Sequence, residues 1–414
     1  MAFLESFSIT NIVVVGSKFF YALSYFVFLY VLQNNLSVDD FQIFAKFMSV
    51  VGFISLIAHF GQSRSLLHEF KGLRNDYEEL GVSVNKSINL ISFLIVATFP
   101  IALILNYSLN IHGFLISILT VVSVINYISQ YFLNFLFSKL RMNIQFSLLI
   151  FFLAPFISIT LILIRILKSD DQLDLYSTIF IFELSRTIIN IFLFYFLTKK
   201  LELQKLNFFN LPNIIKSIYI SISDILINSM KHLYVLIFSY FAFPEEIAFL
   251  YIALRFCELI LLPAKAILNR YSPEMSELYY QNNSIGLNEK IFQQILLLFM
   301  SSVVLILILF FLLEFIFFAF SIDNKFIESF LFFIIAAAIN SIFYHQDVLL
   351  ILKKKYFVLI SFLLIELILF LLACIFLYNI MGILALALTV FIFKTIKHVS
   401  LLIYFKSIIS LKYE

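Results

Sequence analysis

The sequence predicts an all-α integral membrane protein with about twelve transmembrane helices, arranged in two six-helix halves. Apolar residues make up 63% of the chain and charged residues 13%, whereas soluble domains are close to half apolar and a quarter charged. The mean hydropathy is +1.04. Loops rich in Lys and Arg also alternate along the chain with loops that contain neither, which is typical of a multi-pass membrane protein. Lipid is therefore the expected solvent for most of the chain.

Twelve segments are apolar enough and long enough to cross a bilayer. A span needs about 20 residues, because a helix rises about 1.5 Å per residue through a hydrocarbon core about 30 Å thick. The polar stretches between the segments are short, so no sizeable soluble domain is expected. The predicted spans are 10–33, 40–60, 87–108, 112–137, 143–165, 174–198, 213–241, 246–269, 290–320, 326–349, 356–379 and 381–405.

The distribution of Lys and Arg predicts the orientation of the chain, because short cytoplasmic loops carry an excess of both. Loops after the even-numbered spans contain cations, such as Arg74 after the second span and Lys200 after the sixth. Most loops after the odd-numbered spans contain none. The exceptions are Arg165, Lys168 and Lys325, which stand close to acidic residues in the sequence. Both termini are therefore expected in the cytoplasm.

The second and eighth spans suggest an internal repeat. Each span opens on two consecutive acids and is followed by an Arg, and the two spans are offset by 206 residues. Two helix hairpins of equal length can also align in this way, but the coincidences favour a repeat with halves 1–206 and 207–414. The halves would then be related by a pseudo-two-fold axis along the membrane normal. The residue pairs at this offset are Asp39 with Glu245, Asp40 with Glu246, Arg64 with Arg270, and Lys18 with Asp224.

The usual catalytic and metal-binding signatures are absent. The eight glycines form no dinucleotide-binding, Walker-type or nucleophile-elbow motif. The histidines show no metal spacing, and the nearest arrangement, His345-x-Asp347, is more often a polar contact between helices. Cys257 and Cys374 lie in apolar runs, where they are expected to be packing residues. We therefore expect a protein that is not an enzyme, with no catalytic residue, no metal and no cofactor.

Charged residues inside the spans are the most informative feature. Each costs free energy in hydrocarbon, so each should face the interior of a bundle or an aqueous cavity. Three of them, Lys265, Lys397 and Glu314, are close enough to a span end to extend toward water. The cations are Lys18, Lys46, Arg186, Lys231, Arg255, Lys265, Lys394 and Lys397, and the acids are Glu183, Asp224, Glu258, Glu314, Asp347 and Glu366. Those nearest to the predicted midplane are Lys18, Arg186, Asp224 and Arg255.

Several of these charges lie on polar stripes, because residues three or four apart share one face of a helix. Two pairs, Glu183 with Arg186 and Arg255 with Glu258, are one helical turn apart. Each pair is expected to form either an internal ion pair or part of a ligand site. The stripes are Ser217, Ser221, Asp224, Asn228 and Lys231 in the seventh span, Gln42, Lys46 and Ser49 in the second, and Glu183, Arg186 and Asn190 in the sixth.

Two stretches of the chain carry a resemblance to a known family. One runs from Leu36-Ser-Val-Asp-Asp-Phe to Gly61-Gln-Ser-Arg64. The other runs from Tyr251-Ile-Ala-Leu-Arg-Phe-Cys-Glu-Leu-Ile-Leu-Leu-Pro through Ser272-Pro-Glu-Met-Ser-Glu-Leu-Tyr279. They resemble the second and eighth spans of the polysaccharide-unit (Wzx-type) flippases, which belong to the superfamily that also holds the multidrug and toxin extrusion transporters. The resemblance in architecture covers the whole chain.

The resemblance implies a function. Such flippases move an undecaprenyl-diphosphate-linked oligosaccharide from the cytoplasmic to the periplasmic leaflet of the bacterial inner membrane, by alternating access of two halves, for cell-surface polysaccharide assembly. The implied partners are the lipid-linked oligosaccharide, membrane lipids and other polysaccharide-assembly membrane proteins, and no nucleic acid. A cationic cavity would offset the desolvation of the diphosphate. Energy would come from the membrane potential or from a coupling ion, H⁺ or Na⁺.

The charges in the spans provide the candidate site. Lys18 and Lys46 have no acid within reach on their own helices, so we expect both to face a cavity. Asp224 and Glu258 are the candidate ion-coupling residues, because an acid at mid-depth can exchange a proton or Na⁺. The expected substrate-binding residues of the cationic cavity are Lys18, Lys46, Arg186, Lys231 and Arg255.

Other functions remain open at this stage. An ion-coupled exporter of drugs or metabolites with the same fold is the first alternative, although it would need an acidic, aromatic cavity for organic cations. A membrane-embedded oligosaccharide polymerase or glycosyltransferase is the second. Asp39-Asp40 in the first predicted external loop is the feature in its favour, but such enzymes usually carry large external loops, which are not evident here. A static membrane scaffold is the third, and it would have no need of charges at the midplane.

Overall fold

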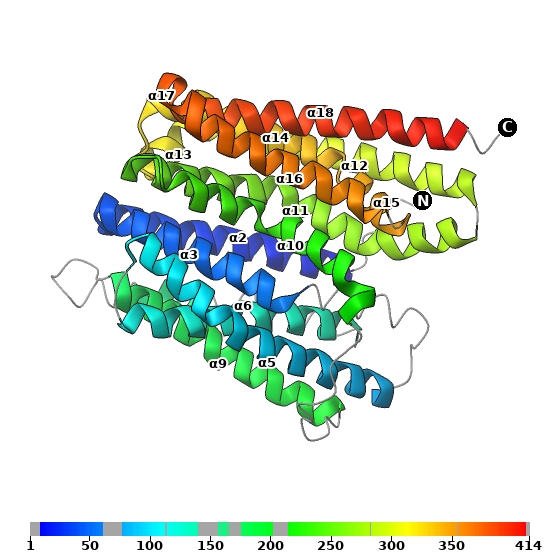
Figure 1. Cartoon of the computed structure of the whole chain (residues 1–414), viewed down its shortest axis with the longest axis horizontal. Helices are drawn as coiled ribbons and strands as arrows, with labels where there is room; N and C mark the ends of the chain where they lie inside the picture. The colour runs from blue at the N-terminus through cyan, green and yellow to red at the C-terminus, as the bar shows by residue number, and fades with distance from the viewer. Residues whose placement is uncertain are drawn as a thin grey trace. The chain divides into compact units, whose positions relative to one another are not determined.

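The computed structural model describes residues 9–60, 77–111, 114–139, 156–157, 159–162, 164, 175–201, 214–281, 283–353 and 355–410. Throughout these ranges the regular structure is helical, and no strand is found in them (Figure 1). The all-α class predicted from the sequence is therefore confirmed.

Eight of the helices in the described ranges are long and apolar enough to cross a membrane. Three further helices coincide with the predicted first, fourth and seventh spans, and the predicted span 143–165 is helical wherever it is described. The chain is a multi-pass membrane protein. The helices that coincide with the three further spans are α2 (Ile9–Asn35), α6 (Phe114–Lys139) and α10 (Ile214–Phe238). The eight apolar segments are Val38–His59, Leu90–Ser108, Leu175–Phe196, Pro244–Ala264, Ile285–Phe311, Asn324–Ile342, Tyr356–Met381 and Ile383–Tyr404.

The chain divides into two compact units, Met1–Tyr240 and Phe241–Glu414. This boundary follows α10, whereas the sequence repeat divides the chain into 1–206 and 207–414. Helix α10 groups with unit 1 because it packs along α3 (Val38–His59). Compactness does not identify a repeat, so the division into two six-helix halves stays a prediction.

Unit 1 is built around α3. Ser37 caps this helix by accepting a hydrogen bond from the Asp40 backbone N–H at 3.1 Å, and Phe60 ends it in the left-handed conformation. Helix α3 packs against α10, α6 and α5 (Tyr77–Ser108), and α6 packs in turn against α9 (Leu175–Leu201). The apolar window of α3 is 72% buried, the largest fraction among the candidate spans of the described residues. Polar side chains in the middle of α3, such as Ser49 and Ser55, are therefore buried.

Unit 2 is built around α11 (Pro244–Tyr280). Helix α11 packs against α12 (Ser284–Phe311) and α14 (Ile327–Ile342), and α14 packs against α18 (Ile383–Ser410). Aromatic rings fill the contact between α11 and α14. Phe256 lies edge-on to Phe330 with ring centroids 5.5 Å apart, which is a favoured geometry for aromatic pairs.

Helices α3 and α11 occupy corresponding places in the two units. Each begins one residue before its acidic pair, α3 at Val38 and α11 at Pro244, and each is the most buried candidate span described in its unit. Acids in the first turn interact favourably with the helix dipole. This shared register concerns these two helices alone, and the repeat of the two halves stays a prediction.

Three interruptions divide helices that the sequence predicts as continuous. The predicted span 290–320 is split into α12 and α13 (Leu313–Ala319), and the predicted span 326–349 is split into α14 and α15 (His345–Leu352). A π-helical segment, η3 (Ala373–Leu377), separates α16 (Tyr356–Leu372) from α17 (Tyr378–Met381). Hydropathy measures suitability for lipid and carries no information about such local breaks.

Lys325, one of the cations in a predicted external loop, is neutralised by acids. It lies in the 3₁₀ helix η2 (Asn324–Phe326), with its ammonium 3.2 Å from Asp323 and 3.8 Å from Glu245. The Lys325 backbone N–H donates to Asp323 at 3.0 Å, and this bond together with the ammonium holds the pKa of the Asp323 carboxyl below its ordinary value. The local pairing is consistent with a Lys in a loop otherwise expected to lack cations.

Candidate functional site

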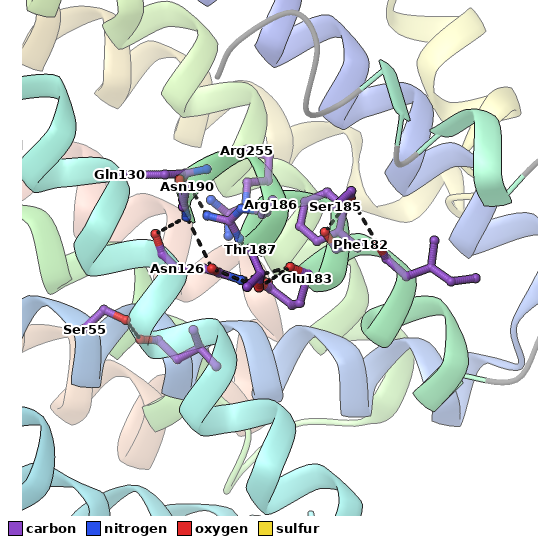
Figure 2. A network of polar contacts seen from close by, with 12 residues as sticks. Ser55, Asn126, Gln130, Phe182, Glu183, Ser185, Arg186, Thr187, Asn190 and Arg255 are labelled. Atoms are coloured by element: carbon purple, nitrogen blue, oxygen red, sulfur yellow. Dashed lines mark hydrogen bonds and ion pairs between the residues drawn. The ribbon is translucent and has the colours of Figure 1, made fainter. Parts of the chain in front are cut away.

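A buried polar cluster lies between α6 and α9 in unit 1 (Figure 2). Its centre is Arg186, whose Nη1 lies 3.0 Å from Glu183 Oε1 and whose Nη2 donates to Gln130 Oε1 at 2.6 Å. The side chains of Arg186 and Glu183 are 3% and 1% exposed. The internal ion pair, one of the two alternatives open from the sequence, is therefore present.

Aromatic rings and an amide complete the surroundings of this ion pair. The Arg186 guanidinium carbon is 5.3 Å from the centroid of the Tyr127 ring and 5.4 Å from that of Phe182, within the range of cation–π interactions. Asn126 Nδ2 donates to Glu183 Oε2 at 2.8 Å. Both charges of the pair are thus held by groups of α6 and α9 themselves.

The part of this cluster that lies on α6 was not predicted from the sequence. Asn126 and Gln130 are four residues apart and share one face of the predicted fourth span, so the helical period was the available signal. Thr187 donates to Asn126 Oδ1 at 3.1 Å, and Asn190 Nδ2 lies 3.2 Å from the same oxygen. Asn190 belongs to the stripe predicted on the sixth span, and the structure adds Asn126, Gln130 and Thr187 to it.

Lys46 lies two turns inside α3 and is half-buried. Within the described part of the chain it makes no ion pair and no hydrogen bond. Its stripe neighbours are engaged locally, since Gln42 Nε2 donates to Asp39 Oδ1 at 3.4 Å and Ser49 donates to the Ala45 carbonyl at 2.8 Å. Lys46 is therefore a cation on the most buried helix of unit 1 with no described carboxylate at ion-pair distance, and the acid that acts on it electrostatically is Asp39 in the first turn of the same helix.

The stripe predicted on the seventh span lies on α10, where Ser221 is buried and Lys231 is half-buried. Asp224 falls within α10 and Lys18 within α2, but the side chains of both lie outside the described part of the structure. Their assignments, to the cationic cavity for Lys18 and to ion coupling for Asp224, remain predictions.

Arg255 of α11 is also held by its own helix. Its Nη1 lies 2.7 Å from Glu258 Oε2, its Nη2 donates to the Tyr251 hydroxyl at 2.9 Å, and its guanidinium carbon is 4.7 Å from the centroid of the Tyr251 ring. The side chain of Glu258 is 24% exposed, against 9% for Arg255. The spacing at one helical turn thus gives an ion pair here too, with the carboxylate as its more accessible partner.

A second buried cluster lies in unit 2, and one expectation about it is wrong. Lys397 was expected to extend toward water, but its side chain is 1% exposed and its ammonium lies 2.8 Å from Asp347 Oδ1. Lys394 similarly lies 2.8 Å from Glu366. The expectation failed because distance along a helix does not reveal an acid on another helix. Of the His345-x-Asp347 arrangement, Asp347 thus contacts another helix, and His345 is buried.

The structure pairs four of the span cations with acids, and each pair lies within one unit. The sequence predicted a single cavity that contains all five substrate-binding residues, and that cavity stays a prediction. Among the residues that the structure describes, no group of three His, Cys, Asp or Glu side chains is placed to hold a metal ion. The cation–acid pairs are Arg186 with Glu183, Arg255 with Glu258, Lys394 with Glu366, and Lys397 with Asp347.

No family model and no curated protein matches the sequence, but solved structures match the fold over almost its whole length. One is an inward-facing multidrug resistance MATE family transporter of the MOP superfamily, 17% identical, with 96% of this chain and 94% of that chain covered and a TM-score of 0.68. The chain has the fold of the MATE transporters.

Two further structures with the MATE fold are similar to this chain. An outward-facing multidrug resistance MATE family transporter is 14% identical, with 97% of this chain and 96% of that chain covered and a TM-score of 0.65. A MOP superfamily transporter from Pyrococcus furiosus Vc1 (DSM3638) is 11% identical, with 98% and 96% covered and a TM-score of 0.60. The predicted fold class is confirmed.

Proposed function

We propose that the protein is a flippase that moves undecaprenyl-diphosphate-linked oligosaccharide units from the cytoplasmic to the periplasmic leaflet of a bacterial inner membrane. The position of the Lys46 ammonium is the observation on which the proposal rests. A half-buried ammonium two turns inside the most buried helix of unit 1 costs free energy in an apolar bundle unless water or an anion reaches it. A diphosphate is an anion of the required kind, and Lys is a common phosphate-binding residue.

Lys46 differs from four other interior cations in its contacts with acids. Arg186, Arg255, Lys394 and Lys397 each contact a carboxylate at 3.0 Å or less. A cation in direct contact with a carboxylate brings little net positive potential to a substrate, whereas a cation with no carboxylate at ion-pair distance brings more. Lys46 is thus the primary substrate contact in the proposal, with Lys18, Lys231, Arg186 and Arg255 as further predicted substrate-binding residues.

The fold supports transport by alternating access. The similar structures include both an inward-facing and an outward-facing MATE family transporter. For the P. furiosus transporter, reverse polarity of the binding pocket is described as suggesting a different function. Pocket charge is accordingly the feature from which we infer the substrate class here. Both termini would lie in the cytoplasm, and the driving force would be the membrane potential or a gradient of H⁺ or Na⁺, with Asp224 and Glu258 as coupling candidates.

One observation favours a second candidate, an ion-coupled exporter of drugs or metabolites. The ion pairs of Arg186 and Arg255 neutralise two of the cations on which the cationic cavity was predicted. Glu258 is more exposed than its partner and lies one turn from the Arg255–Tyr251 contact, so an organic cation could compete for it. This exporter would share the fold and differ in the charge of its substrate.

Deletion of the gene separates the two functions. The flippase proposal expects lipid-linked oligosaccharide to accumulate on the cytoplasmic side and surface polysaccharide to be lost. Complementation by Lys46→Ala should fail at normal protein abundance, while Lys325→Ala, which changes an exposed lysine in the predicted external loop, should restore export. Increased sensitivity to cationic drugs with unchanged surface polysaccharide would instead support the exporter.

A further inference from the structure

Helix α11 carries an ion pair at the point where the helix becomes accessible. Every residue from Ile247 to Cys257 is buried, and the next residue, Glu258, is partly exposed. Arg255 Nη1 lies 2.7 Å from Glu258 Oε2, and the two side chains are 9% and 24% exposed. The pair therefore joins a guanidinium in the buried part of the helix to a carboxylate at the start of its accessible part.

Tyr251 holds the guanidinium of Arg255 from the buried side. Its hydroxyl accepts a hydrogen bond from Arg255 Nη2 at 2.9 Å, and its ring centroid lies 4.7 Å from the guanidinium carbon. Tyr251 is itself 2% exposed, so it is a fixed part of the helix packing. Neither contact involves Glu258. Tyr251 can therefore keep Arg255 in place when the carboxylate turns away from it.

The carboxylate of the other one-turn ion pair, Glu183 with Arg186, is held differently. Its side chain is 1% exposed, and its Oε2 accepts a hydrogen bond from Asn126 of α6 at 2.8 Å. An anion that replaced Glu183 would have to break a buried contact between two helices. Glu258 belongs to the same type of pair but is accessible, so its exchange for another anion requires less rearrangement.

The contact with Glu258 has two consequences for Arg255. A guanidinium inside a span costs free energy when no anion accompanies it, and the Glu258 carboxylate removes that cost when no substrate is bound. The same contact occupies Nη1, one of the groups with which an arginine binds phosphate oxygens. A phosphate can therefore bind this face of Arg255 only after it displaces Glu258.

Displacement of a carboxylate discriminates between two kinds of anionic lipid. An anionic phospholipid such as phosphatidylglycerol carries one negative charge on its phosphodiester, which equals the charge of the carboxylate it would replace. A diphosphate-linked lipid carries two, and its second phosphate adds attraction to cations that the phosphodiester lacks. Specificity is often achieved by an element that is unfavourable for the competitor. The Glu258 carboxylate is such an element against phosphodiester lipids.

We propose that Glu258 is a specificity-determining residue, whose carboxylate occupies Arg255 until a diphosphate displaces it and so excludes phosphodiester lipids; this rests on the proposed flippase function. When the diphosphate binds, the carboxylate turns away while Tyr251 keeps the guanidinium in place. When the substrate leaves, the carboxylate returns to Arg255. This role differs from the ion coupling predicted for Glu258 from the sequence, because it needs no change in protonation.

A gain of function tests this role. Glu258→Gln keeps the size of the side chain and removes its charge, so phosphatidylglycerol should gain access to Arg255. The protein is reconstituted in liposomes with fluorescent phosphatidylglycerol, and the fraction accessible to a membrane-impermeant quencher is followed over time. We expect Glu258→Gln to move this lipid at least about tenfold faster than the unmodified protein, the factor that corresponds to one hydrogen bond between charged groups.

Three further variants make the result specific. Glu245→Gln is the matched control, because it removes the same charge from a position of α11 that is 66% exposed, and it should leave phosphatidylglycerol movement unchanged. Adding Arg255→Gln to Glu258→Gln should abolish the gain, because no guanidinium remains for the phosphate. Glu258→Asp keeps the charge but draws it back from Arg255, and should give a smaller gain. It provides the test if thermal unfolding in detergent shows that Glu258→Gln does not fold.

The same liposomes are assayed with a fluorescent undecaprenyl-diphosphate-linked oligosaccharide. If the unmodified protein moves only this lipid and Glu258→Gln moves both, the proposal is supported together with the proposed function. If Glu258→Gln gains phosphatidylglycerol movement but the unmodified protein does not move the diphosphate lipid, the proposed function fails and the exclusion of phosphodiester lipids by Glu258 stands. Phosphatidylglycerol movement at the unmodified rate in the folded Glu258 variants overturns the proposal.

Discussion

Gly52 of α3 lies against the imidazole ring of His232 of α10, so closely that a Cβ atom on residue 52 would overlap the ring. His232 is itself buried. Small residues at such crossings let two helices approach closely, which is a major source of attraction between helices that have lipid as their solvent. The contact provides a physical reason why α10 groups with the helices of unit 1.

The first prediction concerns this contact. Gly52→Ala should destabilise the protein by about 1–3 kcal/mol, because the methyl group overpacks the interface. Adding His232→Ala to it should give a double variant that is more stable than the sum of the two single effects, because the methyl group then has room. Thermal unfolding in detergent measures this, and strict additivity of the two substitutions would contradict the close contact.

The second prediction concerns the ion pair of Arg186. Glu183→Gln should destabilise the protein by about 3–5 kcal/mol, because it leaves a buried guanidinium without its counter-ion. Glu183→Gln combined with Arg186→Met should recover most of that loss, because no charge is left buried. Unfolding in detergent again measures the effect.

The same double variant decides between the two roles left open for Arg186. Oligosaccharide export at the normal rate would assign the pair to packing alone. A stable double variant that fails to export would assign Arg186 to the substrate site as well.

The third prediction concerns a contact in unit 2, where the Tyr378 hydroxyl donates to the Glu246 carboxylate. Tyr378→Phe should lower the stability by about 1.5–3 kcal/mol, the usual range for a hydrogen bond to a charged group. Tyr240→Phe is the matched control, since Tyr240 shares a 2.8 Å hydrogen bond with the neutral Ser108 at an exposed position. Equal losses in the two variants would argue against the Glu246 bond.

The fourth prediction concerns topology. Reporter fusions after Lys200 and after Lys355 should report a cytoplasmic position, and a fusion near Asn110 should report a periplasmic one. A periplasmic signal after Lys200 would contradict the Lys and Arg pattern on which the orientation rests.

Features set by a single helix could be predicted from the sequence. The predicted second span, 40–60, agrees closely with α3, because an apolar segment flanked by acids is both lipid-compatible and well capped. The pairs Glu183–Arg186 and Arg255–Glu258 followed from their spacing at one turn. The spacing of residues along one helix is enough to predict such pairs.

Features that depend on two helices could not be predicted in the same way. The Asp347–Lys397 pair joins α15 to α18, and no period links residues so far apart in the chain. Helix α11 continues to Tyr280, well beyond the predicted span end at residue 269, because a polar segment outside the lipid can still be helical. Gln130 was not predicted as part of the cluster, although it lies four residues from Asn126 in the sequence, because the prediction started from charged residues and neither of these two carries a charge.

The central claim, that Lys46 lies in a substrate path for a lipid-linked anion, is tested most directly by flipping in proteoliposomes. The purified protein is reconstituted with a fluorescent undecaprenyl-diphosphate-linked oligosaccharide, and the fraction accessible to a membrane-impermeant quencher is followed over time. We expect the unmodified protein and Lys325→Ala to move the probe, and Lys46→Ala to move it far more slowly. Equal rates for Lys46→Ala and the unmodified protein, or transport of an organic cation in place of the probe, would contradict the account.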